Sequence, residues 1–398
     1  MKIGLVTAEY PPMQGGVGDF SHEIAKAMAT LGHEVHIITN FKQVSNSKSE
    51  EDGVRVERVI NSWKWSCWRS LSEASRRLGL EVVNIQYEAA AFRMHPAINL
   101  MPMVRHCLFV GWPRSLPIVV TFHDLKVPYL FPKAGPLRRQ SVLTLARYAD
   151  AAIVTNPEDE TDLRSAIGPR QSAIRLIPIG SNIAPHLPQR YNRDEWRARW
   201  NVKSGETLIG YFGFLHPLKG GEVLVRALAE LASEGRAVKL LLIGGRTGSS
   251  DADTNAPYAA QVESLARELG VADRIAATGY VPPDQVSASF YATDVFALPF
   301  IEGASLRHGT FHAALAHGRA IVTTCPPVTL DELRDGENIL LVPPNDAHAL
   351  VDGIRRVMDN PALRTRLESG ATELAQQFAW DRIAARTVQV YEQVRGLR

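Results

Sequence analysis

Glycine and lysine residues after a short apolar segment give the first chemical signal in this 398-residue sequence. The apolar residues 207–212 are followed by Gly213 and, just before an expected helix, by Lys219. A cation at a helix start is unfavourable unless an anion lies nearby, because the helix dipole is positive there. Glycine also lets the backbone approach a ligand closely. We therefore expect Gly213 and Lys219 to face a phosphate group; the alternative is a solvated lysine at a helix start.

A second polar segment follows the apolar residues 295–298. Glu302 can accept hydrogen bonds from hydroxyl groups, and the planar guanidinium of Arg307 can hold two phosphate oxygens. Gly309 and Thr310 would open the next helix, where free backbone N–H groups bind anions. A structural loop is the alternative, but an acid, an arginine and glycines with few apolar residues favour a binding loop.

A glycine-rich segment, Gly15-Gly16-Val17-Gly18, lies between the first expected strand and the first expected helix. It does not match the G-x-G-x-x-G pattern of dinucleotide-binding proteins, and a plain strand-to-helix turn is the alternative. Two features favour a ligand site. The loop is long, from residue 9 to residue 18, and it leaves the carboxyl end of a strand, where open α/β sheets bind ligands.

Polar residues at the ends of two neighbouring strands form the third candidate group. His123 and Asp124 follow one expected strand, and Gln86 and Glu88 follow the other. His123 can donate a hydrogen bond to a sugar hydroxyl or a phosphate, or transfer a proton. A structural histidine is the alternative, and the convergence of these polar groups on one crevice favours a functional role.

The three tryptophans and two cations between Trp63 and Arg69 have two interpretations. The segment can dock on an anionic membrane surface and bring the protein to a lipid-linked acceptor. The tryptophans can instead pack between elements while the cations stay exposed, and residue composition favours this second interpretation.

The composition is that of a globular chain. Apolar residues make up 45% and charged residues 22%, and a net charge of +2 argues against nucleic acid as the main partner. Cys67, Cys107 and Cys325 lie far apart without metal-ligand spacing, and the sequence begins without a secretory signal. No stretch reaches the ~18–20 uninterrupted apolar residues of a spanning helix. We expect reduced thiols, no metal, and a cytoplasmic protein whose only membrane contact is peripheral, at the inner face.

Two sets of alternating strands and helices must position the candidate residues. Nearly continuous apolar runs predict buried parallel strands. They are residues 2–7, 34–39, 82–86, 118–123, 151–155 and 174–177 in the first half, and 207–212, 239–244, 275–278, 295–298, 320–323 and 339–342 in the second. Helical spacing occurs at 19–31, 220–233, 258–269, 311–317 and 381–397. This alternation predicts an α/β protein with two doubly wound, Rossmann-like domains.

The polar, Pro-containing residues 183–191 predict the domain boundary. The first domain then covers residues 1–185 and the second residues 192–380. The last helix follows the final strand, and its own pattern leaves open which domain it packs on.

Motifs along nearly the whole chain resemble the retaining GT-B glycosyltransferases of family four, the group 1 glycosyl transferases. Each motif alone is weak, whereas their ordered set is specific. The set comprises Glu9-Tyr10-Pro11-Pro12 with the glycine loop, Thr121-Phe122-His123-Asp124, Ile177-Pro178-Ile179-Gly180, residues 213–220, Thr278-Gly279-Tyr280, residues 294–299 and Ala316-His317-Gly318. The resemblance implies a GT-B fold of two facing domains, with the last helix, 381–398, crossing back to the first.

In such enzymes the second domain binds the nucleotide diphosphate and the first takes the acceptor. The resemblance implies that Lys219 faces the phosphates, that Gly16 approaches them from the other domain, and that His123 lies near the donor sugar. The remaining implied contacts are Gly15, Gly18 and Gly213 near the donor, Gly279 and Tyr280 at the base, and Gln86, Glu88 and Asp124 on the acceptor side. No metal or separate cofactor is implied, because basic side chains and helix ends neutralise the leaving diphosphate.

The sequence departs from the family at two positions. The arginine expected after Gly213 is Phe214, and the second of two glutamates in the donor motif is Ala313. The residues expected to compensate are Arg307 as the cation, Thr310 or Ser305 for polar contacts, and Glu302 as the surviving acid.

The expected reaction moves a hexosyl group from a nucleotide sugar to a hydroxyl of a glycan, a lipid-linked acceptor or a small molecule, and keeps its anomeric configuration. The family implies front-face attack assisted by the leaving phosphate, with Lys219 and Arg307 stabilising charge and domain closure excluding water. Two alternatives are a GT-B phosphorylase or epimerase, and a non-catalytic homologue that binds nucleotide sugars.

Overall fold

The computed structural model describes residues 1–13, 15–41, 48–105, 112–113, 115–125, 135–168, 173–245 and 252–397. They form two compact units, Met1–Ile179 together with Trp380–Arg398, and Gly180–Ala379. The chain enters the second unit at Gly180, just before the segment 183–191 in which the sequence predicts a boundary. Each unit has its own buried apolar core.

The first unit is built on a sheet. Its eight described strands have the order β3-β4-β2-β1-β5-β6-β7-β8, with one antiparallel pair, β3 with β4. They are β1 (Lys2–Val6), β2 (Glu34–Asn40), β3 (Lys48–Glu51), β4 (Val54–Ile60), β5 (Val82–Tyr87), β6 (Ile118–Phe122), β7 (Ala151–Val154) and β8 (Ala173–Leu176). The strand order reverses between β1 and β5, and such a switch point opens a crevice at the carboxyl ends of the strands.

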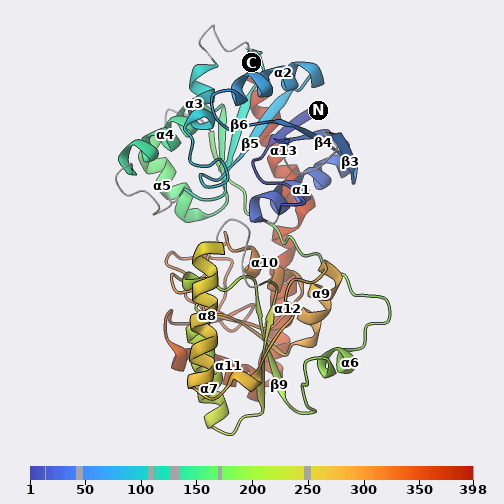
Figure 1. Cartoon of the computed structure of the whole chain (residues 1–398), viewed down its shortest axis with the longest axis vertical. Helices are drawn as coiled ribbons and strands as arrows, with labels where there is room; N and C mark the ends of the chain where they lie inside the picture. Colours follow the sequence, from blue (N-terminus) through green and yellow to red (C-terminus); the bar gives the residue numbers. More distant parts are fainter. Residues whose placement is uncertain are drawn as a thin grey trace. The chain divides into compact units, whose positions relative to one another are not determined.

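The described helices of the first unit are α1 (Gly16–Thr30), α2 (Cys67–Leu78), α3 (Ala97–Val104), α4 (Gly135–Tyr148), α5 (Pro157–Ile167) and α13 (Trp380–Gly396). The C-terminal helix α13, red in Figure 1, packs beside α1. The hydroxyl of Tyr391 accepts a hydrogen bond of 2.6 Å from Asn84 Nδ2, and both side chains are buried. A polar bond inside this apolar contact fixes how α13 lies on the sheet.

The second unit contains a parallel sheet. Among its described residues six strands have the order β11-β10-β9-β12-β13-β14. They are β9 (Thr207–Phe212), β10 (Val238–Ile243), β11 (Ile275–Ala277), β12 (Val295–Leu298), β13 (Ile321–Thr324) and β14 (Leu340–Val342). The order reverses between β9 and β12, so the crevice of this unit lies where these two strands end.

Helices flank the second sheet, as Figure 1 shows for α7 and α8. They are α6 (Arg193–Ala198), α7 (Gly221–Ser233), α8 (Ala252–Glu268), α9 (Pro283–Ala292), α10 (Gly309–Ala316), α11 (Ala347–Asp359) and α12 (Pro361–Ala375). The predicted α/β class with two doubly wound sheets is confirmed. The twelve predicted strands match observed strands with their ends at most one residue away.

Two strands were not predicted, and two helices, α1 and α8, begin earlier than predicted, α8 at Ala252 rather than at residue 258. Strand β4 begins with the alternating residues Val54, Arg55 and Val56, and the polar β3 pairs with it at the sheet edge. Neither strand therefore shows a continuous apolar run. Helix α1 begins at Gly16 rather than at residue 19. Gly16 and Gly18 therefore belong to the first turn of a helix, and only Gly15 lies in the loop.

Candidate functional site

Two loops meet where β9 and β12 end in the second unit. The backbone N–H of Ile301 donates to the carbonyl of Leu218 at 2.9 Å, which ties the loop after β12 to the loop after β9. Gly220 has φ +71°, and a β-carbon there would overlap the carbonyl oxygen of Pro299. The close approach of these two loops therefore requires glycine at position 220.

Gly213, Lys219 and Thr310 converge at this point. Gly213 follows β9 with φ +107°, and a β-carbon on it would lie 2.6 Å from Thr310 Cγ2 and 3.3 Å from Lys219 Nζ. Lys219 ends a short 3-10 turn, η2 (Pro217–Lys219), in which His216 Nδ1 accepts a hydrogen bond from Leu218 N–H. Thr310 lies in the first turn of α10. An ammonium group and the first turn of a helix thus lie beside one backbone position without a side chain, which is a suitable geometry for a phosphate.

The loop from Glu302 to Thr310 is partly exposed and partly buried. Glu302 is exposed, and its Oε2 lies 3.5 Å from Nη2 of Arg307, which is half-buried. The predicted acid and cation therefore form a charge pair with each other. Ser305 is only 3% exposed, and its hydroxyl has no hydrogen-bond partner among the described residues. A buried hydroxyl of this kind costs about 1–3 kcal/mol unless water or a ligand supplies a partner.

Gly279 and Tyr280 follow β11 at the same edge of the sheet. Gly279 has φ +65° and forms a β-bridge with Gly244, whose N–H donates to Thr278 Oγ1 at 3.0 Å. Tyr280 is 73% exposed. Its ring has the exposure that stacking on a planar base needs.

The α10 helix is apolar toward the core of the second unit. Ala313, where the family pattern has its second glutamate, is fully buried. His312 and His317 are also buried; His312 Nε2 lies 2.7 Å from Leu306 O, and His317 Nδ1 lies 2.7 Å from Ala313 O. Burial lowers the pKa of both imidazoles to about 4. These neutral rings are structural, and Thr310 is the α10 side chain that meets Gly213.

In the first unit, the loop after β1 holds an acid against the start of α1. Glu9 is 7% exposed, and a β-carbon on Gly15 would overlap its carboxylate. A carboxylate beside a helix N-terminus is favourable, because the helix dipole is positive there. Gly15 thus accommodates Glu9, and Gly18 closely approaches the Glu9 backbone. By contrast, a β-carbon on Gly16 would meet nothing within 4 Å, so the space beside Gly16 is open.

His123 and Gln86 meet at the ends of β6 and β5. His123 Nε2 lies 2.9 Å from Gln86 Oε1, and the edge of its ring contacts Phe20 of α1. Burial lowers the pKa of His123 to about 3, so the ring is neutral near pH 7 and a weak base. Because a general base works best with a pKa near the working pH, this environment suits hydrogen bonding better than proton transfer. Glu88 and Asp124 follow these strands and are half-buried.

Comparison with known proteins gives the family. The model of the glycosyl transferases group 1 matches residues 192–374, and that of the glycosyl transferase 4-like domain matches residues 15–180. A D-inositol 3-phosphate glycosyltransferase of Acidothermus cellulolyticus is 30% identical over 424 residues, which cover 98% of this chain and 90% of the relative. The chain belongs to the group 1 glycosyl transferases.

Solved structures show the fold. Sucrose-phosphate synthase from Thermosynechococcus elongatus superposes with a TM-score of 0.76 and 23% identity over 100% of both chains. Anabaena HepE in complex with UDP-glucose has a TM-score of 0.71 and 17% identity, covering 100% of this chain and 99% of that one. The fold of this glycosyltransferase is therefore GT-B, as the sequence predicts.

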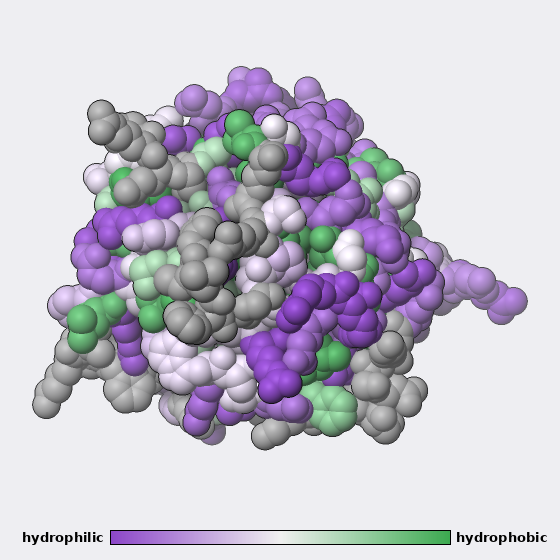
Figure 2. Space-filling view, turned by 90° about the horizontal axis from the view of Figure 1, so that it is seen from above, coloured by the Kyte–Doolittle hydropathy of each residue, from purple (hydrophilic) through white to green (hydrophobic). Residues whose placement is uncertain are grey.

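The tryptophan segment of this glycosyltransferase is mostly packed. Trp63 is 4% exposed, and Trp68 donates its Nε1–H to the carbonyl of Ala97 at 2.8 Å. Trp65 is 50% exposed and lies edge-on to Trp68. Figure 2 shows one face of the molecule, on which apolar side chains form separate green areas among hydrophilic ones. Packing thus explains two of the three tryptophans, and membrane docking through Trp65 stays a prediction. No described helix is long and apolar enough to cross a membrane.

Two of the expected thiols lie in the described part of the chain. Cys67 and Cys325 are free, and burial raises the pKa of Cys67 to about 12. Cys107 lies outside the described residues.

The sequence did not predict two contacts that position the candidate site residues of this glycosyltransferase. The contact of Glu9 with Gly15 joins residues six apart, and only the path of the loop shows it. His216 caps the turn that carries Lys219. The sequence signal for this cap was the pair His216-Pro217, because proline suits the first position of a helical turn and the residue before it is then the cap.

Proposed function

We propose that this glycosyltransferase moves a sugar from a nucleotide sugar to a hydroxyl acceptor and retains the anomeric configuration. The observation that carries the proposal is the meeting of Lys219 Nζ and Thr310 over the bare backbone of Gly213. A donor diphosphate fits there because its negative charge meets a lysine and a helix N-terminus at a switch point of the sheet.

The leaving diphosphate defines the role of each group in the second unit. As the glycosidic bond to the donor phosphate breaks, negative charge grows on the phosphate oxygens. Lys219 and the N–H groups at the start of α10 stabilise that charge, and Arg307 adds a second cation. The Tyr280 ring stacks on the base. These groups replace a metal ion in our proposal, so the reaction needs neither a metal nor a separate cofactor.

Retention of configuration follows in our proposal from attack on the same face that the diphosphate leaves. The leaving phosphate oxygen then accepts the proton of the acceptor hydroxyl. The second unit provides positioning and charge stabilisation for this route. In the first unit the neutral His123, fixed by Gln86, offers a hydrogen bond to a sugar hydroxyl.

The acceptor class is suggested by the curated relatives, which are named for D-inositol 3-phosphate. A phosphorylated polyol is therefore the first acceptor to test in our proposal. At about 30% identity the acceptor pocket has room to differ, so free polyols and glycans belong in the same panel.

The experiment combines binding and transfer. Thermal shifts are measured with UDP, GDP, ADP and TDP and their sugars, for the wild type, Lys219→Met and the exposed control Lys203→Met. We expect one base to stabilise the wild type and Lys203→Met, because a ligand that binds only the folded state raises its stability. Lys219→Met should lose most of that shift and about 100-fold in kcat/KM, the usual cost of removing one transition-state donor.

The transfer assay uses the donor so identified with inositol 3-phosphate and other hydroxyl acceptors. The anomeric configuration of the product is read by NMR, and the assay is repeated with EDTA. A retained configuration and full activity in EDTA are expected. An inverted product or loss of activity in EDTA contradicts that part of the proposal. Nucleotide binding without transfer or hydrolysis would make the chain a binding protein.

A further inference from the structure

A cavity lies in the second unit at the edge of the sheet opposite the proposed donor site. Its volume is about 250 Å³, and it is lined by residues at the amino ends of β9 and β12, including Thr207 and Val295. Gly213 and the loop after β12 lie at the carboxyl ends of the same two strands. Because the strands are parallel, the two places are on opposite edges, and this cavity is separate from the proposed donor site.

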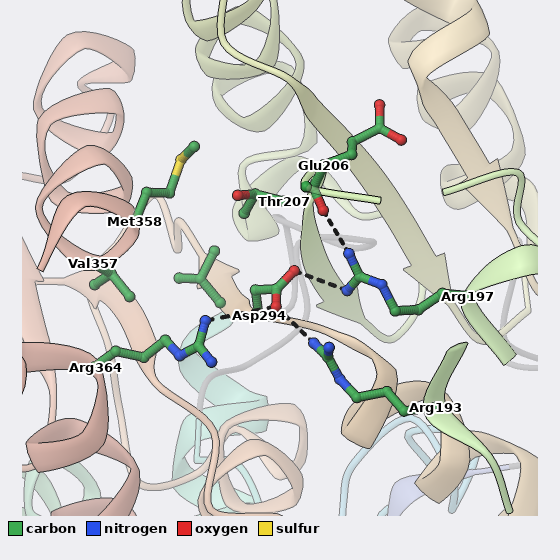
Figure 3. Close-up of a pocket in the computed structure, with 10 residues that line it drawn as sticks. Arg193, Arg197, Glu206, Thr207, Asp294, Val357, Met358 and Arg364 are labelled. Atoms are coloured by element: carbon green, nitrogen blue, oxygen red, sulfur yellow. Dashed lines mark hydrogen bonds and ion pairs between the residues drawn. The ribbon is translucent and has the colours of Figure 1, made fainter. Parts of the chain in front are cut away.

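Three arginines from two helices surround one carboxylate in this cavity (Figure 3). Asp294 precedes β12. Its Oδ1 lies 2.6 Å from Arg193 Nη2 of α6 and 3.6 Å from Arg364 Nη1 of α12, and its Oδ2 lies 2.9 Å from Arg197 Nη1 of α6. One negative charge is therefore shared among three positive ones.

Arg197 is the structural member of this group. It is buried, and besides Asp294 its guanidinium donates to the carbonyls of Ala292 and Glu206. Asp294 in turn accepts the backbone N–H of Leu208 at 2.8 Å. Burial acts to raise the pKa of Asp294, but the hydrogen bonds from Leu208 and Arg197 outweigh it and the pKa is lowered. The carboxylate is thus a fixed anion that joins α6 to the start of two strands.

Arg193 and Arg364 are more exposed than Arg197, although the guanidinium of Arg193 also donates to the carbonyls of Tyr291 and Thr293. Their side chains are 41% and 42% exposed, so solvent reaches both guanidinium groups. Among the residues that the structure describes, the Arg364 guanidinium makes only long contacts, at 3.6 Å to Asp294 and at 3.6 Å to Glu368. These distances do not fit good charge-assisted hydrogen bonds, which are near 2.7–2.9 Å.

Among the residues that line the cavity three arginines stand against two acids, while Glu368, which does not line it, lies 3.6 Å from Arg364. Glu206, the other acid that lines it, accepts the backbone N–H of Lys203, and Figure 3 shows its carboxylate directed away from the three arginines. Like charges held together repel, and an anion placed between Arg193 and Arg364 relieves this repulsion. Met358 and Val357 line another part of the cavity and can contact an apolar group.

We propose that this cavity binds a small phosphate-bearing anion between Arg193 and Arg364. Guanidinium groups suit phosphate because their planar forks bind two oxygens at once. The volume is several times the ~30 Å³ of a water molecule in the liquid, enough for a phosphate group with a short organic part. The ligand class is inorganic phosphate or a small phosphate monoester, and the site is additional to the donor and acceptor sites.

The test measures binding of inorganic phosphate and of glycerol 3-phosphate by calorimetry and thermal shift, with sodium chloride at matched ionic strength as the salt control. The proteins are the wild type, Arg193→Gln, Arg364→Gln and Lys219→Met, with the exposed Arg356→Gln of α11 as the matched control. Each variant is first compared with the wild type without ligand. Arg364 is half-exposed with only long contacts, so Arg364→Gln should fold normally even if Arg193→Gln does not.

We expect wild type, Arg356→Gln and Lys219→Met to bind the probe equally, and Arg193→Gln and Arg364→Gln to lose about tenfold in affinity each. Tighter binding of glycerol 3-phosphate than of phosphate identifies a phosphate ester as the ligand, and equal binding identifies phosphate. Unchanged binding in Arg364→Gln, or a shift that chloride reproduces, overturns the proposal. Loss of binding in Lys219→Met alone also overturns it, since it places the anion at the donor site and leaves the proposed function intact.

Discussion

Arg307 is the residue expected to supply the cation that the family has after Gly213, where this chain has Phe214. It lies 3.5 Å from Glu302, so its charge is partly balanced before any ligand binds. If Arg307 replaces the missing family arginine, Arg307→Gln should lower kcat about 100-fold through loss of charge stabilisation. Arg307→Lys should recover only part of the activity, because lysine keeps the charge but not the planar fork. Steady-state kinetics with saturating donor measure both effects.

The control for this prediction is Arg356→Gln, which removes an exposed arginine of α11. Glu302→Gln separates two roles of Arg307. If Glu302 only holds Arg307 in place, Glu302→Gln should change kcat less than Arg307→Gln does. Unchanged kcat in Arg307→Gln, with donor KM also unchanged, would show that the arginine serves the loop alone.

At the same scale, the sequence predicted those contacts that follow directly from strand order. Gly213 and Thr310 lie after adjacent strands, and Lys219 ends the short turn before α7, so parallel pairing of the strands brings them together. The contact of Glu9 with Gly15 depends on the path of a loop, which has no periodic pattern to reveal it. The burial of Ser305 was unforeseen for the same reason.

The turn between β9 and α7 is the element on which the donor site depends most. Gly220→Ala should cost the ~1–2 kcal/mol of a left-handed non-glycine residue and, in addition, push the turn away from Pro299. The displaced turn carries Lys219, so we expect a lower Tm together with a loss of activity larger than the loss of folded protein explains. Calorimetry and kinetics on the same sample measure both.

Gly235→Ala is the matched control. Gly235 has φ +79°, close to the φ +71° of Gly220, but a β-carbon on it would meet nothing within 4 Å. Alanine is thus under similar backbone strain at the two positions, whereas only the alanine at position 220 overlaps a neighbouring group, the carbonyl oxygen of Pro299. Equal effects of the two substitutions on activity would mean that the contact of Gly220 with Pro299 does not position the site.

The elements themselves show where sequence patterns succeed. Strands of a parallel sheet that is covered on both faces read as nearly continuous apolar runs, and those runs predicted β1, β2 and β5 to β14. In β4, which lies beside the edge strand β3, Val54 and Val56 are buried and Arg55 between them is exposed, so this strand has no continuous apolar run. The start of α1 at Gly16 was missed because glycine is a poor helix former. The role of Gly16 depends on the open space beside its backbone, which the sequence does not show.

Across the whole molecule, buried charge is what the sequence predicts least. Asp294 was expected only as part of a family motif, while its three arginine neighbours come from positions 193, 197 and 364. No local pattern links these positions, because α6, β12 and α12 meet only in the folded unit. The buried histidines are a second example, since His312 and His317 lie on an apolar helix whose neighbours the sequence does not give.

These histidines predict how the stability of the molecule depends on pH. His312 and His317 have pKa values of about 4, against about 6.5 when unfolded. Below pH 6.5 the unfolded chain takes up protons that the folded chain does not, so the free energy of unfolding falls as the pH drops from 6.5 to 4. Each histidine contributes a loss on the order of 3 kcal/mol over that range, and none above pH 7.

Denaturant unfolding at pH 7.5, 6.0, 5.0 and 4.5 measures this loss. His317→Gln removes one titrating group and keeps a side chain that can reach Ser287, the partner of His317 Nε2 at 2.9 Å. We expect His317→Gln to be less stable than the wild type at pH 7.5 but to lose less stability on acidification. His186→Gln, at an exposed position, should follow the wild type. Parallel pH curves for His317→Gln and the wild type would mean that His317 is not the group that resists protonation, and that the acid sensitivity arises from charged pairs elsewhere.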